Sequence, residues 1–96
     1  MLLPLLLACA TLTDDIATMC DAPSLSGVTE KDPSLRAPAL ARWIEGNLKT
    51  TEGRTFFAAL PMIPGAERGP LLRERAKEAG IAACPYAAEL GASVTP

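Results

Sequence analysis

The fold is decided by residues 32–48, which read DPSLRAPALARWIEGNL. Asp32 followed by Pro33 is typical of an N-cap and a first helical residue, because proline lacks the N–H that would be unpaired there. Behind them, large apolar side chains recur at helical spacing and share one face: Leu40, Trp43, Ile44 and Leu48. Pro38 interrupts the pattern, so the helix either begins there or is kinked there. The stretch predicts an amphipathic helix that buries one side, Trp43 included, in a core.

Shorter helical patterns lie on both sides of this stretch. Upstream, apolar residues at helical spacing predict a first helix over residues 14–20, with Thr13 as its N-cap. Residues 21–32 contain proline, glycine and serine with little apolar periodicity, and they predict a surface loop.

Downstream, the pattern predicts a short helix over residues 51–60, followed by a turn over 61–70 that is rich in proline and glycine. A strong helical run over 71–79 comes next, with Gly80 placed to cap it in the left-handed conformation. A last turn or helix extends over residues 84–90, with proline again at a tolerated first position.

The chain as a whole has the size and pattern of one small helical domain. Its 96 residues allow a single core of marginal stability. No run of residues alternates apolar and polar side chains as a half-buried strand does. We therefore expect an all-α fold, a compact bundle of four to five short helices, with one domain over residues 14–90 and a flexible tail over 91–96.

The N-terminus has the form of an export signal. Residues 1–9 read MLLPLLLAC, an apolar segment far too short to cross a bilayer as a helix. Within it, Leu6-Leu7-Ala8-Cys9 resembles the lipobox of bacterial lipoproteins, and the resemblance covers residues 1–9 only. The segment departs from that pattern in two ways: no Lys or Arg precedes the leucine run, and the run is short.

The resemblance implies a signal peptide over residues 1–8, cleaved before Cys9, lipidation of Cys9, and a lipid-anchored tether over residues 9–13. Stable anchoring takes two or more acyl chains, because one chain alone binds a membrane reversibly. A lipoprotein of this kind is held to the outer or inner membrane of the bacterial cell envelope and faces the periplasm; Ala10 after the lipidated cysteine implies the outer membrane in a Gram-negative cell. The alternative is an apolar first helix over residues 1–10, against which Pro4 argues.

The cysteine count agrees with export. Three cysteines become one lipid-bearing residue, Cys9, and one pair, Cys20 and Cys84, with no thiol left over. Small exported domains commonly need such a covalent link, so we expect a Cys20–Cys84 disulfide that closes the bundle. The alternative is two buried free thiols in a cytoplasmic protein. Either way, the spacing of the cysteines excludes a zinc knuckle.

Composition argues against several function classes. The sequence contains no histidine, the commonest general base and metal ligand, so we expect neither an enzyme nor a metal site, and no cofactor. The net charge is −2 and the arginines are scattered, which argues against binding to nucleic acid. The carboxylate pairs Glu45/Glu52 and Glu74/Glu78, and the arginines Arg36, Arg42 and Arg54, are interpreted as ordinary surface charge.

Three hypotheses for function remain, and the first is a membrane-anchored accessory module that binds a protein partner in the cell envelope. The second is a small thiol-redox protein. Cys84-Pro85-Tyr86-Ala87 resembles the Cys-Pro-Tyr-Cys motif of glutaredoxins, with the second cysteine replaced and the motif near the wrong end of the chain. The third is a ligand carrier with an apolar cavity beside Phe56, Phe57 and Trp43. The first hypothesis explains an anchor without requiring an active site.

Overall fold

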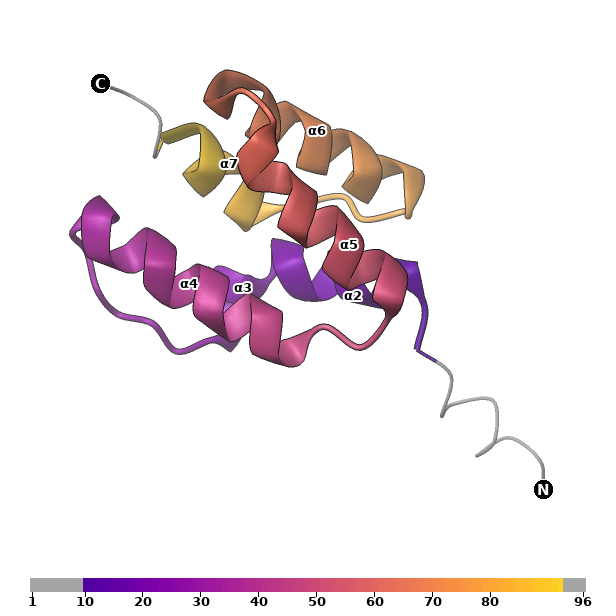
Figure 1. Cartoon of the computed structure of the whole chain (residues 1–96), viewed down its shortest axis with the longest axis horizontal. Helices are drawn as coiled ribbons and strands as arrows, with labels where there is room; N and C mark the ends of the chain where they lie inside the picture. Colours follow the sequence, from indigo (N-terminus) through magenta and orange to yellow (C-terminus); the bar gives the residue numbers. More distant parts are fainter. Residues whose placement is uncertain (1–9, 93–96) are drawn as a thin grey trace.

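The computed structural model describes residues 10–92, which contain six α-helices, one 3₁₀ turn and no strand (Figure 1). In chain order the elements are α2 (Leu12–Cys20), α3 (Ala22–Leu25), α4 (Pro33–Asn47), α5 (Thr51–Ala59), η1 (Leu60–Met62), α6 (Gly65–Glu78) and α7 (Pro85–Ala92). The predicted all-α fold and its single disulfide, between Cys20 and Cys84, are confirmed.

Helix α2 is the element on which the others pack. It contacts α3, α4, α5, α6 and α7. In Figure 1, α5 crosses in front of α2, α4 lies in the lower part of the view, and α6 and α7 lie in the upper part. The buried apolar residues form one cluster: Ile16, Met19, Cys20, Ala22, Leu40, Ile44, Leu48, Phe57, Leu60, Leu72, Ala76, Tyr86 and Ala87. Each described helix except α3 is therefore held by larger apolar side chains, and α3 contributes only Ala22.

The first described helix begins earlier than predicted. Thr11, not Thr13, is the N-cap of α2: its hydroxyl accepts a hydrogen bond from the Asp14 N–H, and the Asp14 carboxylate accepts one from the Thr11 N–H. This reciprocal capping box pairs two backbone donors at once, which a cap at Thr13 would not do. Residues 11–13, predicted as part of a tether, therefore belong to the folded domain.

The predicted loop over residues 21–32 contains a short helix, α3. Pro23 takes an early position there, where its missing N–H costs nothing. Ala22 is fully buried against the core and supplies the tertiary contact that the local pattern does not reveal. The rest of the segment, up to Asp32, is irregular as predicted.

Helix α4 begins as the sequence predicts. The Asp32 side chain accepts a hydrogen bond from the Ser34 N–H, and Pro33 is the first helical residue. The helix starts five residues before Pro38 and continues past it, so it does not begin at that proline. Trp43 is partly buried and packs against the core, as predicted.

Helix α6 begins six residues before the predicted start at Leu71, so the turn predicted over 61–70 is shorter than expected. Pro70 lies inside the helix, where it removes one backbone hydrogen bond near the N-terminal end. Arg68, in the first turn of the helix, donates hydrogen bonds to the carbonyls of Pro61 and Ile63, which links η1 to α6. Gly80, with φ +80°, ends α6 in the left-handed conformation as predicted.

The last helix joins the disulfide to the C-terminal end of the domain. Cys84 directly precedes α7 and is bonded to the fully buried Cys20 in α2. Helix α7 extends to Ala92, so the predicted tail does not begin at residue 91; residues 93–96 lie outside the described part of the chain. None of the described helices combines the length and the hydropathy that a membrane crossing requires.

Candidate functional site: an apolar groove beside α4

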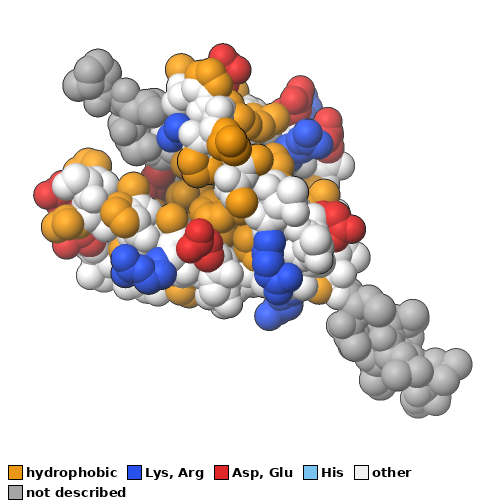
Figure 2. Space-filling model, in the orientation of Figure 1, with side chains coloured by type: hydrophobic (Ala, Val, Ile, Leu, Met, Phe, Trp, Pro, Cys, Tyr) orange, Lys and Arg blue, Asp and Glu red, His pale blue; other side chains and the backbone are white. Residues whose placement is uncertain are grey.

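A row of hollows lies along α4. The backbone of α4 packs closely on α2 and α3, whereas its other side faces α5, η1 and α7 across a row of three cavities. Neighbouring cavities share lining residues, so together they form one groove. Figure 2 shows hydrophobic side chains gathered between α4 and α5, with charged side chains at the edges.

The central cavity is the largest of the three, at about 430 Å³. Small or exposed apolar residues form much of its wall, among them Ala37, Pro38, Ala41, Ala58 and Pro61, while Phe57, Leu60 and Tyr86 are buried behind them. The wall also carries two charges, Glu45 from α4 and Arg68 from α6. It thus combines an apolar floor with rims of opposite sign.

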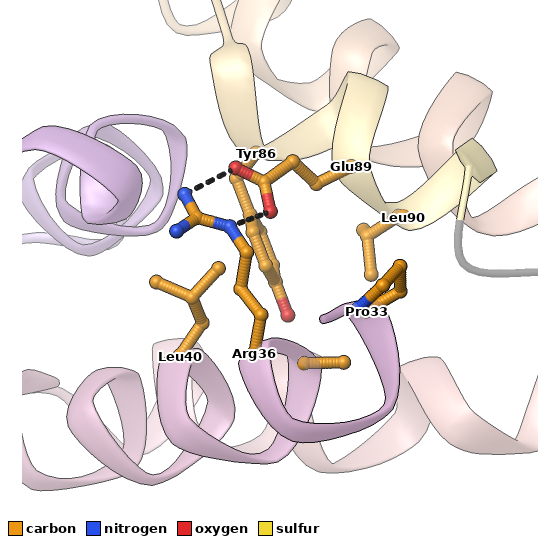
Figure 3. A pocket seen from close by; sticks show the side chains of 7 residues that line it. Pro33, Arg36, Leu40, Tyr86, Glu89 and Leu90 are labelled. Carbon is orange, nitrogen blue, oxygen red and sulfur yellow. Dashed lines mark hydrogen bonds and ion pairs between the residues drawn. The ribbon is translucent and has the colours of Figure 1, made fainter. Parts of the chain in front are cut away.

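An ion pair between α4 and α7 limits one end of the groove. Arg36 donates hydrogen bonds from Nε to Oε1 of Glu89 (2.7 Å) and from Nη2 to Oε2 (2.8 Å) (Figure 3). Its Nη1 also donates to the carbonyls of Val28 and Glu30. The hydrogen bonds that Arg36 donates to the Glu89 carboxylate, together with the negative charge of Glu89, raise the pKa of Arg36. Beside the pair lies a cavity of about 100 Å³ against Leu40, Tyr86 and Leu90. Arg36 is therefore a structural link, not the ordinary surface charge that we expected.

The opposite end of the groove lies where α4 gives way to α5. Its cavity, of about 250 Å³, is lined by Glu45, Leu48, Arg54, Phe57 and Ala58. Arg54 reaches across this end and donates a hydrogen bond from Nη2 to the Leu48 carbonyl. A cation from α5 and a carboxylate from α4 therefore face the same cavity.

Tyr86 connects the groove to the core. Its ring extends from α7 toward α4 and lines both the central cavity and the cavity at the Arg36 end (Figure 3). Burial, reinforced by the negative charge of Glu89, raises the pKa of Tyr86 to about 12, although Arg68 acts in the opposite direction. The phenol is therefore neutral at physiological pH and presents an apolar ring face.

The position of the α5 wall is set by Asp15, a residue that the sequence did not single out. Its carboxylate is buried in α2 and accepts hydrogen bonds from the Lys49 N–H, the Thr50 N–H and the Thr50 hydroxyl. Burial alone would raise the pKa of Asp15, but these hydrogen bonds and the nearby Arg54 outweigh it and lower the pKa. The ionised carboxylate thus fixes the turn from which α5 departs.

The structure brings together some of the predicted residues and separates others. Of the aromatic residues expected around a cavity, Phe57 lines the groove, whereas Phe56 lines a different hollow next to Leu12 and Arg75, and Trp43 lines none of the cavities described above. Cys84 is half of the disulfide. Cys9 lies outside the described residues. Glu45, Glu52, Glu74 and Glu78 are exposed, and no cluster of three or more His, Cys, Asp or Glu suited to a metal ion occurs within residues 10–92.

The groove residues that the sequence reasoning missed share a detectable signal. Ala37, Ala41 and Glu45 recur every fourth position, which aligns them on one side of α4 apart from the strongly apolar Leu40–Ile44 face. Small side chains at such spacing leave room for a partner, but they equally suit an ordinary exposed helix. The opposite wall comes from residues 57, 58, 60, 61, 68, 86 and 90, which only the tertiary fold brings near α4.

Comparison with known proteins gives no relative: no family model, no curated protein and no solved structure matches this chain.

Proposed function

We propose that this chain is a small exported lipoprotein, anchored through Cys9 in the bacterial cell envelope, whose helical domain is an accessory module that binds a protein partner. The signal peptide would be residues 1–8. The domain would face the periplasm from the membrane that holds the lipid. No catalytic role is assigned to it.

The Cys20–Cys84 disulfide is the observation that carries the proposal. Disulfides persist in oxidising compartments such as the periplasm and are rare in the cytosol, where thiols are kept reduced. With these two cysteines bonded to each other, the third, Cys9, is left at the end of the leucine run. That pairing leaves Cys9 for lipidation, the role that the lipobox resemblance implies.

Binding to a partner is supported by the groove beside α4. Within residues 10–90, its walls leave apolar side chains uncovered, including Ala37, Pro38, Ala58 and Pro61. The domain would also lie close to the lipid, because the N-cap of α2 is only two residues beyond Cys9. A partner would therefore have to reach the groove near the membrane surface.

Intact mass spectrometry of protein purified from its native membrane fraction tests the proposal. The expected mass lacks residues 1–8, includes acyl chains, and increases by two hydrogens on reduction. Cys9→Ser is the matched control, and it should abolish acylation while leaving the disulfide intact. An unacylated chain of full length with three free thiols would refute both export and anchoring.

The groove also supports a second candidate function, the carriage of an apolar ligand. Its three cavities are lined mainly by apolar atoms and lie end to end, as an extended hydrocarbon would require. Saturable binding of oleate to the purified domain would favour this candidate. A thiol-redox role, in contrast, requires Cys84 to be a free thiol, which titration with and without a reductant tests directly.

A further inference from the structure

We propose that the groove beside α4 binds an amphipathic helix of the partner, one with an apolar stripe flanked by basic residues on one side and acidic residues on the other. The proposal rests on the accessory-module function proposed above and specifies the partner's chemistry. Two observations support it: the order of the cavities along α4 and the charges of the residues at the rims.

The cavities follow one another along α4. Along α4 the three cavities are lined in turn by residues 33–40, 37–45 and 45–48. Ala37, Ala41 and Glu45 are four residues apart, so they recur about every 6 Å along the helix axis. An amphipathic helix presents anchor side chains at i, i+4 and i+7 with a similar repeat. Alanines at 37, 41 and 58 leave space for larger side chains of the partner.

The charges on the two walls differ in sign. Glu45 on α4 faces the central cavity and the cavity at the α5 end. Across from it, Arg68 faces the central cavity and Arg54 the end cavity. A helix lying in the groove would gain most from basic residues along the α4 side and acidic residues along the α5 and α6 side, as flanking positions do in coiled coils.

A helix suits this groove better than a fatty anion does. A carboxylate-bearing lipid would need cations without a competing anion, but Glu45 faces two of the three cavities. At the Arg36 end of the groove, the positive charge of Arg36 is already neutralised by its ion pair with Glu89. The arrangement of charges therefore favours a ligand that carries both signs on opposite flanks.

Peptide binding to the oxidised full-length chain carrying Cys9→Ser tests the inference. The probes are three designed helical peptides of about 15 residues, roughly four turns. They share leucines at i, i+4 and i+7 and differ in their flanks: mixed charges, all acidic or all basic. We expect the mixed peptide to bind with a Kd about fivefold lower than either control, since partly exposed ion pairs contribute modestly.

Two pairs of variants localise the binding. Glu45→Lys makes both walls basic and should shift the preference to the all-acidic peptide, whereas Glu74→Lys, the same charge change on the exposed side of α6, should not.

Ala58→Leu fills the groove and should weaken binding at least tenfold, while Ala88→Leu, an exposed alanine outside the groove lining, should have no effect. Circular dichroism verifies that each variant is folded.

Several results would overturn the inference. Equal affinity for all three peptides would show that the charged rims do not select the peptide. Binding that Ala58→Leu leaves unchanged would show that the peptide does not bind in the groove. Saturable binding of oleate with no binding of any peptide would make the groove a lipid site. Concentration-dependent dimerisation of the chain that Ala58→Leu abolishes would assign the groove to a second copy. None of these results depends on acylation of Cys9, so export and anchoring are tested separately.

Discussion

The Thr50 hydroxyl donates a 2.6 Å hydrogen bond to Oδ2 of Asp15, which joins two residues 35 positions apart in the sequence. The same hydroxyl accepts a hydrogen bond from the Gly53 N–H in the first turn of α5. Asp15 therefore holds the N-cap residue of α5, and with it the wall of the groove that carries Phe57 and Ala58. Asp15 is the only buried charged side chain within residues 10–90.

Replacing Asp15 by asparagine should destabilise the domain by about 3 kcal/mol. The amide cannot accept all three hydrogen bonds, and it leaves at least one buried donor from Lys49 or Thr50 unpaired. Urea unfolding measures the change. Asp14→Asn is the matched control: that carboxylate is exposed and caps α2, so its loss should cost about 0.5 kcal/mol. Equal costs at the two positions would contradict a special role for the buried carboxylate.

The contribution of Asp15 should depend on pH in a defined direction. Its pKa is lowered in the folded chain, whereas in the unfolded chain it is about 3.9. The stabilisation is therefore complete above the unfolded value and is lost as the pH falls through the folded value. The difference in unfolding free energy between the wild-type chain and Asp15→Asn should be constant near neutral pH and shrink below about pH 4. A difference in unfolding free energy that grows as the pH falls would show that the pKa of Asp15 is raised, not lowered, in the folded chain.

Two glycine-to-alanine substitutions should have opposite effects. A Cβ at Gly53 would overlap the Asp15 carboxylate, so Gly53→Ala should cost about 2 kcal/mol or more in unfolding free energy. A Cβ at Gly46 would meet only open space, so Gly46→Ala should stabilise α4 by about 0.5–1 kcal/mol. Thermal and urea denaturation measure both variants. Stabilisation by both alanines would show that α2 and α5 are not packed as closely as described.

Removing the disulfide should greatly reduce stability. The bridge joins residues 64 positions apart, and for a loop of that length chain entropy predicts a loss on the order of 4 kcal/mol. The double variant Cys20→Ala/Cys84→Ala removes the bridge without leaving a thiol, and its urea midpoint should fall steeply. Cys9→Ala is the control and should leave the unfolding free energy unchanged. Similar stability of the oxidised and reduced wild-type chains would contradict the expected effect.

Tyr86 should titrate at unusually high pH. It is the only tyrosine in the sequence, so the ultraviolet absorbance of tyrosinate reports on it alone. Burial raises the folded pKa to about 12, from about 10 in the unfolded chain. The stabilisation is present below pH 10 and is lost as the pH rises toward 12, by about 3 kcal/mol for two pKa units. Ionisation of the folded protein near pH 10 would mean that the ring is accessible to water.

Much of the local structure follows from short-range chemistry. Neighbouring residues determine the start of α4 at Asp32-Pro33 and the left-handed end of α6 at Gly80, because caps depend on a few adjacent backbone groups. Predictions were wrong where a distant contact overrides the local signal. Pro70 lies inside α6 although it marks a turn by itself, and α3 forms because Ala22 finds a place in the core.

The sequence by itself determined the helical class, the caps at Asp32 and Gly80 and the pairing of Cys20 with Cys84, since periodicity, capping and cysteine count need no knowledge of long-range contacts. Only the tertiary structure decided the rest. Asp15 accepts a hydrogen bond from Thr50, the N-cap residue of α5, Arg36 pairs with Glu89, and the small residues of α4 face Phe57 and Tyr86. Each of these depends on contacts between different helices or turns, and such contacts are set by how the whole core packs and not by any local pattern.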